Sequence, residues 1–160
     1  MPIATKGSKV DISSEKKLEE FSKKISVKLK KGDILFLYGE MGVGKTTFVK
    51  YLINEYQIKN NLTQTEVTSP TFSLLNEYQV KDIRIKHYDL FRISRKEDIK
   101  NLDIFEKDNK LITLIEWPQL ISDKQDIKFI ALTFNYLNNL NDRSAVSYTH
   151  LRAHETDSYL

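Results

Sequence analysis

The sequence predicts an α/β layer fold, with a mainly parallel sheet to which a β-hairpin adds antiparallel pairing. Two short, nearly continuous apolar runs, at residues 34–38 and 111–115, are typical of strands buried on both faces. Apolar side chains at helical spacing follow the first run, which favours a strand-to-helix unit. Two strand-like segments are separated by only Lys81 and Asp82, and this spacing predicts the hairpin.

The first element that we expect is a helix over residues 13–31. Ser13 or Ser14 can cap its N-terminus, and Gly32 fits the end of the helix. The apolar positions at helical spacing are Leu18, Phe21, Ile25 and Leu29. The lysine-rich stretch at 28–31 is explained by a solvated helix C-terminus, where cations are favoured, more simply than by a nucleic-acid patch.

A second helix is expected after a glycine-rich turn. Its apolar face consists of Phe48, Val49, Leu52, Ile53 and Tyr56. Residues 57–71 are polar and turn-rich, so we expect a loop there. We also expect a short helix over residues 95–102, with Ser94 as its candidate N-cap. The expected strands cover residues 34–38, 72–80, 83–90, 111–115 and 127–136.

Length and composition indicate one soluble globular domain, which we place at residues 1–145 of the 160. Hydrophobic residues make up 40% and charged residues 29%. The absence of cysteine excludes disulfides and thiolate chemistry. No apolar run reaches the roughly 18 residues of a membrane helix, so we expect a cytoplasmic protein without a membrane partner. The net charge of +3 is spread along the chain and is only a weak indication of nucleic-acid binding.

Residues 146–160 are expected to be an atypical tail. A strand can be drawn through residues 145–149, but the lysine- and isoleucine-rich character of the chain stops there. The run resembles a translated sequencing adapter joined to a gene fragment, and we expect the native sequence to depart near residues 144–146. We therefore do not interpret His150 and His154 as metal ligands.

Residues 39–46, Gly-Glu-Met-Gly-Val-Gly-Lys-Thr, match the phosphate-binding pattern G-x-x-x-x-G-K-[ST]. Glycines let the backbone curl so that its N–H groups point at phosphate oxygens. Lys45 supplies positive charge to the β- and γ-phosphates, and the hydroxyl of Thr46 can bind Mg²⁺. Thr47 either contacts the α-phosphate, which we favour, or belongs only to the first helical turn. Between an apolar strand and an amphipathic helix, the motif predicts a nucleotide-binding loop and a three-layer P-loop NTPase fold.

A phosphate loop needs an acid that holds Mg²⁺ or positions water, and two strand ends offer one. Glu116 closes the apolar run 111–115, and Asp89 closes the strand before it. Because the run before Glu116 is so apolar, a functional role is favoured there. The pattern alone leaves Asp89 balanced between a functional acid and an ordinary strand-end acid facing solvent.

Three other features have two interpretations each. Segment 68–71, Thr-Ser-Pro-Thr, either stiffens a turn or offers a hydroxyl that senses the γ-phosphate, and the residues alone favour the turn. Trp117, the only tryptophan, is more often a packing residue than a base-stacking one. His87 lies inside an expected strand and is expected to be structural.

Four segments together resemble the TsaE family, which comprises small bacterial ATPases required for threonylcarbamoyladenosine formation in tRNA. They are GEMGVGKTTF (39–48), SPTF (69–72), HYDLFR (87–92) and EWP (116–118). The phosphate loop is shared by many families, but the combination in this order and spacing is specific. The resemblance runs from about residue 11 to about residue 136.

The resemblance implies ATP and Mg²⁺ as cofactors and assigns roles to individual residues. The residues implied to hold the ATP phosphates are Met41, Gly42, Val43, Gly44, Lys45, Thr46 and Thr47. Thr46 and Glu116 would coordinate Mg²⁺, and Trp117 would lie beside the site. Hydrolysis would depend on Lys45 and Asp89, with Thr71 as a switch hydroxyl. We would look for the adenine near residues 13–15.

The resemblance also implies a partner, the TsaB–TsaD complex, with tRNA reached only through that complex. TsaD transfers the threonylcarbamoyl group, and the ATP cycle would support multiple turnovers of the complex. ATP hydrolysis would therefore reset a partner rather than modify the nucleoside.

Two other functions stay open on the sequence. A small P-loop kinase would need an arginine-bearing lid and a substrate pocket, and the sequence gives no clear sign of either. A nucleotide-gated interaction module would bind nucleotide without useful turnover. A GTPase is disfavoured because Asn109 and Lys110 are followed by Leu-Ile, not by the base-reading x-Asp. Arg92 and Arg95 lie close to Asp89 in sequence, but neither is a sure arginine finger.

Overall fold

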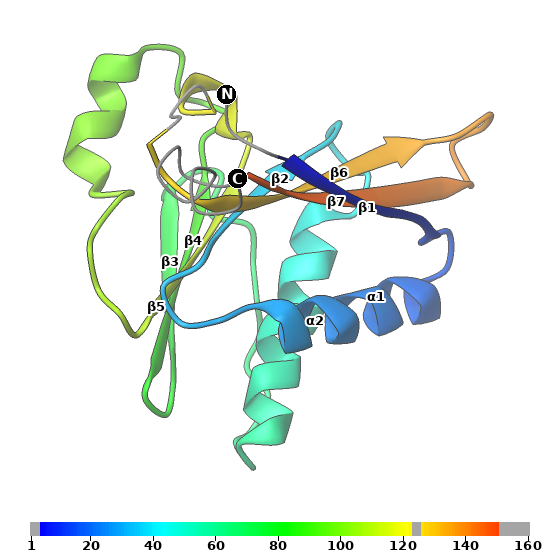
Figure 1. The fold of residues 1–160 in the computed structure, drawn as a ribbon, viewed down its shortest axis with the longest axis horizontal. Coiled ribbons are helices and arrows are strands. Elements are labelled where there is room, and N and C mark those ends of the chain that lie inside the picture. Colours follow the sequence, from blue (N-terminus) through cyan, green and yellow to red (C-terminus); the bar gives the residue numbers. More distant parts are fainter. Residues whose placement is uncertain (1–3, 123–125, 151–160) are drawn as a thin grey trace, which may run out of the picture.

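The computed structural model describes residues 4–122 and 126–150, which form one seven-stranded sheet in the order β1-β7-β6-β2-β5-β4-β3 (Figure 1). The strands are β1 (Ala4–Asp11), β2 (Ile34–Tyr38), β3 (Leu75–Val80), β4 (Ile83–Asp89), β5 (Leu111–Glu116), β6 (Phe129–Tyr136) and β7 (Arg143–His150). β6, β2, β5 and β4 form a central parallel block. β3 pairs antiparallel on one side, and β7 and β1 pair antiparallel on the other. The predicted mixed α/β architecture is confirmed.

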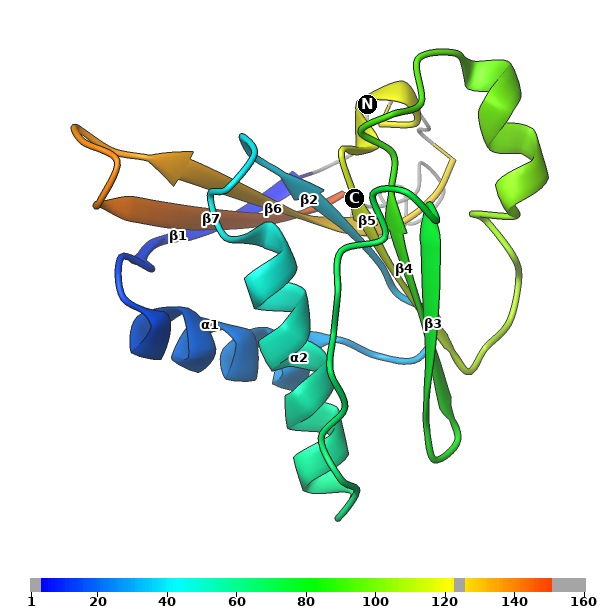
Figure 2. The ribbon, with the colours of Figure 1, turned by 180° about the vertical axis from the view of Figure 1, so that it is seen from behind.

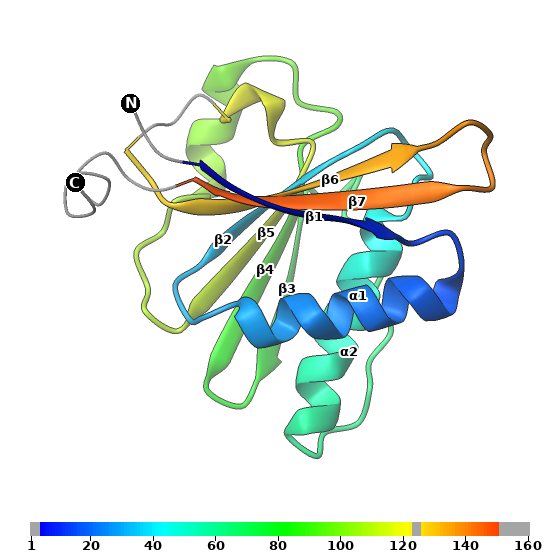
Figure 3. The ribbon, with the colours of Figure 1, turned by 45° about the vertical axis from the view of Figure 1, so that its right-hand side comes forward.

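The two α-helices in the described part of the chain, α1 (Glu15–Lys28) and α2 (Lys45–Lys59), cover the same face of the sheet (Figures 2 and 3). β2 contributes side chains to the cores on both faces of the sheet, because successive side chains of a strand point to opposite faces. Leu35 and Leu37 join the core under the helices, whereas Phe36 joins a second core on the opposite face. That second face is covered by the 3₁₀ helices η1 (Lys96–Leu102) and η2 (Pro118–Leu120) and the segments beside them, with no α-helix among the described residues.

The first helix is shorter than residues 13–31, the range that we expected. Ser14 is the N-cap, and its hydroxyl accepts a hydrogen bond from the Lys17 N–H at 3.2 Å. The helix ends at Lys28 because Leu29 adopts an extended backbone, with ψ of 139°. Gly32, expected to end the helix, lies in the following turn with φ of +94°.

Other element boundaries also shift. The loop expected over residues 57–71 begins later, because residues 57–59 complete α2. The first hairpin strand starts at Leu75 rather than residue 72, since residues 71–73 form a turn that the Leu74 N–H closes onto the Pro70 carbonyl. Residues 96–102 form a 3₁₀ helix, and Ser94 does not cap it. β6 starts at Phe129 rather than at residue 127.

The two strands β1 and β7 change the expected edge of the sheet. We predicted no strand at Ala4–Asp11, whose sequence contains few apolar residues, and it is held by pairing with β7. β7 lies between β1 and β6 and continues across the expected domain boundary at residue 145 to His150. The origin of residues 146–160 stays a prediction, and residues 151–160 lie outside the described part of the chain. No helix in that described part is long and apolar enough to cross a membrane.

Candidate functional site at the carboxyl edge of the parallel strands

The parallel topology brings the ends of β2, β5 and β4 to one edge of the sheet. Asp89 and Glu116 are direct register partners on β4 and β5, and Glu116 pairs in turn with Leu37 on β2. The glycine-rich loop leaves β2 at this same edge and leads into α2. Ligands of open parallel sheets are typically bound outside the carboxyl ends of the strands.

The loop conformation depends on its first glycine. Gly39 has φ of +148°, and a Cβ there would lie 2.8 Å from the Phe134 carbonyl oxygen and 2.9 Å from a methyl of Val43. A larger residue would therefore clash with backbone that cannot move away easily. The loop ends at Gly44, the N-cap of α2, so the positive end of the helix faces the cavity that the loop borders.

Lys45 is buried, with 4% of its surface exposed, although it carries an ammonium group. The ammonium donates to the Gly39 carbonyl and lies 3.7 Å from the centre of the Trp117 ring. Burial lowers the pKa of Lys45, and the carboxylates of Glu116 and Asp89 only partly oppose this shift. The positive charge is thus held in a desolvated position next to the loop.

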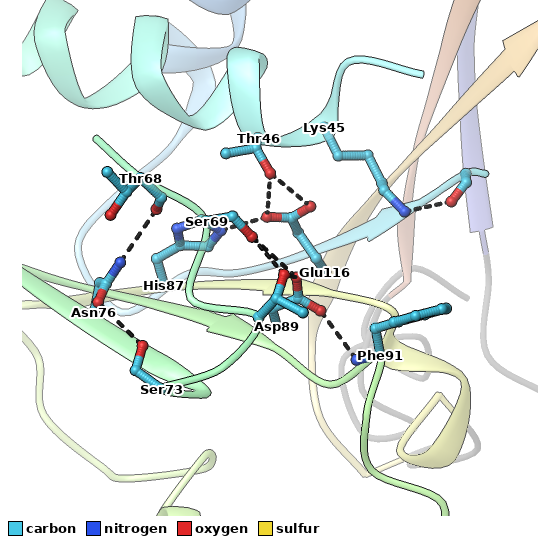
Figure 4. A network of polar contacts seen from close by, with 12 residues as sticks. Lys45, Thr46, Thr68, Ser69, Ser73, Asn76, His87, Asp89, Phe91 and Glu116 are labelled. Atoms are coloured by element: carbon cyan, nitrogen blue, oxygen red, sulfur yellow. Dashed lines mark hydrogen bonds and ion pairs between the residues drawn. The ribbon is translucent and has the colours of Figure 1, made fainter. Parts of the chain in front are cut away.

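Thr46 and Glu116 meet directly in the site (Figure 4). The Thr46 hydroxyl lies 3.2 Å from Oε1 and 3.1 Å from Oε2 of Glu116. Nε2 of His87 lies 2.6 Å from Oε2 of the same carboxylate. His87 is fully buried and Glu116 is 2% exposed, so these contacts take the place of hydration around the carboxylate.

Asp89 is the centre of a second group of contacts (Figure 4). Its Oδ2 accepts a hydrogen bond from the Thr71 hydroxyl at 2.9 Å, and Ser69 lies 3.4 Å from the same oxygen. Its Oδ1 accepts from the Phe91 N–H at 3.0 Å. The Ser69 and Thr71 hydroxyls are 2.6 Å apart. The segment that the residues alone suggested to be a stiff turn is therefore attached to the strand-end acid.

A cavity of about 240 Å³ joins the loop to both groups of contacts. Of the residues that the sequence singled out, it is lined by Met41, Gly42, Gly44, Lys45, Thr46, Thr47, Thr71, Asp89, Glu116 and Trp117. Val43 is different, because its side chain is fully buried in the core below the loop. A larger cavity of about 540 Å³, lined by Ile99, Phe105 and their neighbours, brings together no comparable set of hydroxyls and carboxylates.

Trp117 has a strained backbone with φ of +58°. The centre of its ring lies 3.7 Å from the Lys45 ammonium and 4.8 Å from the centre of the Phe91 ring. The backbone N–H of Trp117 donates to the Leu37 carbonyl at 3.3 Å, which anchors the Trp117 backbone to the end of β2. Trp117 therefore lines the cavity with its ring against the Lys45 side chain.

Sequence reasoning missed Arg143, which comes from β7 and also lines the cavity. Its guanidinium donates to the carbonyls of Val43 and Ser13, each at 3.3 Å. Ser13 is thus linked to the loop through Arg143, but none of residues 13–15, where we looked for the adenine, lines the cavity. No local signal marks Arg143, because its contact depends on the position of β7 in the sheet.

The two candidate finger arginines do not line the cavity. The Arg92 guanidinium lies 5.0 Å from the ring centre of the exposed Phe72. Arg95 pairs with Asp98 on the surface at 3.3 Å. Neither of them contributes to the described site.

These features define a class: an α/β protein with a glycine-rich loop, a buried lysine and two strand-end acids at the carboxyl edge of a parallel block. The family model for threonylcarbamoyl adenosine biosynthesis protein TsaE matches residues 12–145. The chain belongs to the TsaE family, which confirms the resemblance found in the sequence. Proteins of this family take part in threonylcarbamoyladenosine biosynthesis on tRNA.

Curated relatives with the name tRNA threonylcarbamoyladenosine biosynthesis protein TsaE align over most of the chain. The protein from Rickettsia typhi is 36% identical over 128 residues, which are 80% of this chain and 86% of the relative. The protein from Borreliella burgdorferi is 35% identical over 133 residues, 81% of this chain and 93% of the relative. The crystal structure of Bacillus subtilis YdiB is similar in fold, with a TM-score of 0.65 and 21% identity over 96% of this chain and 90% of that one.

Proposed function

We propose that this chain is a Mg²⁺-dependent ATPase with a P-loop NTPase fold, and that it works with the TsaB–TsaD complex in the threonylcarbamoyladenosine modification of tRNA. One observation carries the proposal: the phosphate-loop pair Lys45 and Thr46 lies in one cavity with the strand-end acids Asp89 and Glu116. Chemistry on a phosphate needs these parts together, namely a cation, a metal-binding hydroxyl and acids.

The donor set fits a nucleotide with Mg²⁺. Mg²⁺ prefers oxygen ligands and is usually held by one or two protein groups together with substrate phosphates. Thr46 and Glu116, whose oxygens already lie 3.1–3.2 Å apart, would hold the metal. Bound Mg²⁺ would neutralise negative charge that develops on the phosphates. The backbone of residues 41–47 and the N-terminus of α2 would bind the phosphate oxygens.

The remaining groups of the chain would act on water and on the loop. Asp89 would orient a water molecule beside the terminal phosphate, since its carboxylate lines the cavity and is 4% exposed. In this structure the Thr71 hydroxyl donates to Oδ2 of Asp89. If that hydroxyl turned toward a bound phosphate, it would no longer occupy Oδ2 of Asp89. Lys45 would leave the Gly39 carbonyl and the Trp117 ring to reach the phosphates. Binding would thus couple the loop, the acid and segment 69–71.

The cellular role in the proposal rests on family membership. The relatives are named for threonylcarbamoyladenosine biosynthesis, a process that modifies tRNA. The ATP cycle would reset the TsaB–TsaD complex between turnovers, and tRNA would be contacted only through that complex. Such a subunit would work in the cytoplasm and hydrolyse ATP slowly by itself.

The proposal is tested by phosphate release from ATP and from GTP, with and without Mg²⁺ and with and without purified TsaB–TsaD of the same source. We expect slow, ATP-selective, Mg²⁺-dependent release that changes when the partners are added. Asp89→Asn and Glu116→Gln should each reduce release by about 10²-fold or more, because each removes a group that acts on water or metal. A phosphorylated small molecule as product would instead support a kinase, and tight ATP binding without release would support a gated module.

A further inference from the structure

The buried contact between His87 and Glu116 is used by neither the phosphate loop nor the water-positioning acid. His87 lies on β4 two residues before Asp89, so both side chains project from the same face of the strand. Its Nε2 is 2.6 Å from Oε2 of Glu116, at the end of the neighbouring strand. Its other nitrogen, Nδ1, is buried and has no hydrogen-bond partner among the described residues.

The geometry favours a proton on Nε2, the ring nitrogen that faces Glu116. An ionised carboxylate only accepts hydrogen bonds, so Nε2 of His87 must be the donor. Within residues 4–122 and 126–150, Nδ1 has no hydrogen-bond partner, so a proton there would gain none. The imidazole therefore donates to Oε2 of Glu116, and the Thr46 hydroxyl contacts both Oε1 and Oε2 of the same carboxylate.

We propose that His87 is a positioning residue that fixes the Glu116 carboxylate for Mg²⁺. This inference rests on the proposed function, because it assumes that Thr46 and Glu116 bind the metal. A carboxylate held by a second partner is already oriented before the metal arrives, and loss of such a partner typically weakens metal affinity by about 10–100-fold. Full burial of His87 keeps water from replacing the imidazole as donor.

Two substitutions separate the hydrogen bond from packing. In His87→Gln, the side-chain amide nitrogen can reach the position of Nε2 and donate to Glu116. In His87→Asn, the amide is one methylene shorter and its nitrogen falls near the position of Nδ1. Both variants are neutral amides in the same buried place, so a difference between them reports on the donor to Glu116.

The experiment titrates Mg²⁺ into each protein in the presence of the non-hydrolysable analogue AMPPNP and follows binding by calorimetry. We expect half-saturation by Mg²⁺ to rise about 10–100-fold in His87→Asn and to stay within about threefold of wild type in His87→Gln. Equal Mg²⁺ affinity in His87→Asn and wild type would overturn the positioning role of His87 but not the proposed function. A wild-type protein whose AMPPNP binding is indifferent to Mg²⁺ would overturn the proposed function itself.

A measurement on the wild-type protein keeps the inference testable if His87→Asn does not fold. Long-range proton–nitrogen spectra of ¹⁵N-labelled protein report the tautomer of each of its three histidines. We expect His87 to carry its proton on Nε2 and its Nε2 signal to shift when Mg²⁺ and AMPPNP are added together. A His87 ring protonated only on Nδ1 would exclude donation to Glu116 and refute the proposal.

Discussion

Replacing Lys45 by methionine should stabilise the nucleotide-free protein while removing nucleotide binding. The ammonium makes a charged hydrogen bond to the Gly39 carbonyl, worth about 1.5–3 kcal/mol. It also lies over Trp117, a contact worth about 0.5–2 kcal/mol. Against these, removing an ammonium from water costs several kcal/mol even after relaxation of the protein.

We expect the cost of desolvation to exceed these two contacts, and the lowered pKa of Lys45 supports that order. Burial lowers the pKa of Lys45 although Glu116 and Asp89 attract the charge, so the folded protein disfavours the charged form relative to the unfolded chain. Methionine keeps the length of the side chain and can contact the indole, worth about 0.3–1.5 kcal/mol. We expect a net stabilisation of about 1 kcal/mol, which raises Tm by about 2–4 °C in a chain of this size.

The assay is thermal unfolding of wild type, Lys45→Met and the matched control Lys50→Met, which removes an exposed lysine of the same helix. The unfolded chain binds the Lys45 proton more tightly than the folded protein does. The contribution of Lys45 to the free energy of unfolding of the wild type therefore rises with pH between the folded-state pKa and 10.5. The difference in Tm between Lys45→Met and wild type should therefore become smaller as pH rises through that range. A Tm for Lys45→Met below both wild type and the control at pH 7 would refute the reasoning.

Three further predictions concern the loop, the surface beside β4 and the single tryptophan. Gly39→Ala should destabilise the protein by about 2–4 kcal/mol in chemical denaturation, because the new Cβ would lie 2.8 Å from the Phe134 carbonyl at a positive φ; an unchanged midpoint would contradict this. Glu106→Gln should lower Tm at pH 7, where the carboxylate pairs with the buried Lys86 at 2.8 Å, and the difference should disappear as pH falls below the lowered pKa of Glu106. Addition of ATP should change the fluorescence of Trp117, because Lys45 must leave the ring; the same spectrum with saturating ATP would count against that movement.

Local features of the chain were sufficient to find the strand ends and the loop. The strands at β2 and β5 are predicted because runs such as Ile34–Tyr38 are apolar throughout, as required of strands covered on both faces. The glycine-rich loop is recognised because its backbone geometry demands specific residues at fixed spacing. Glu116 and Asp89 were found as candidates for the same local reason, since each terminates a strand.

Boundaries and edge strands were predicted less well because they depend on partners far away in the sequence. β1 has no clear alternation of its own and forms through pairing with β7. β3 starts at Leu75 rather than at the expected residue 72, because the chain before it turns so that Thr71 can contact Asp89. The strand propensities of residues within a short stretch of sequence carry no information about contacts with distant residues.

The sequence by itself determined which groups the protein offers to a phosphate: a loop built around Gly39, the cation of Lys45 and two strand-end acids. Residue type and spacing fix these, because the chemistry of each group is local. Only the tertiary structure decided how they are connected. The strand order places His87 against Glu116 and brings Arg143 to the carbonyls of Val43 and Ser13, 100 and 130 residues away. Contacts over such separations follow from which strands become neighbours, and that is settled by burial of the whole sheet.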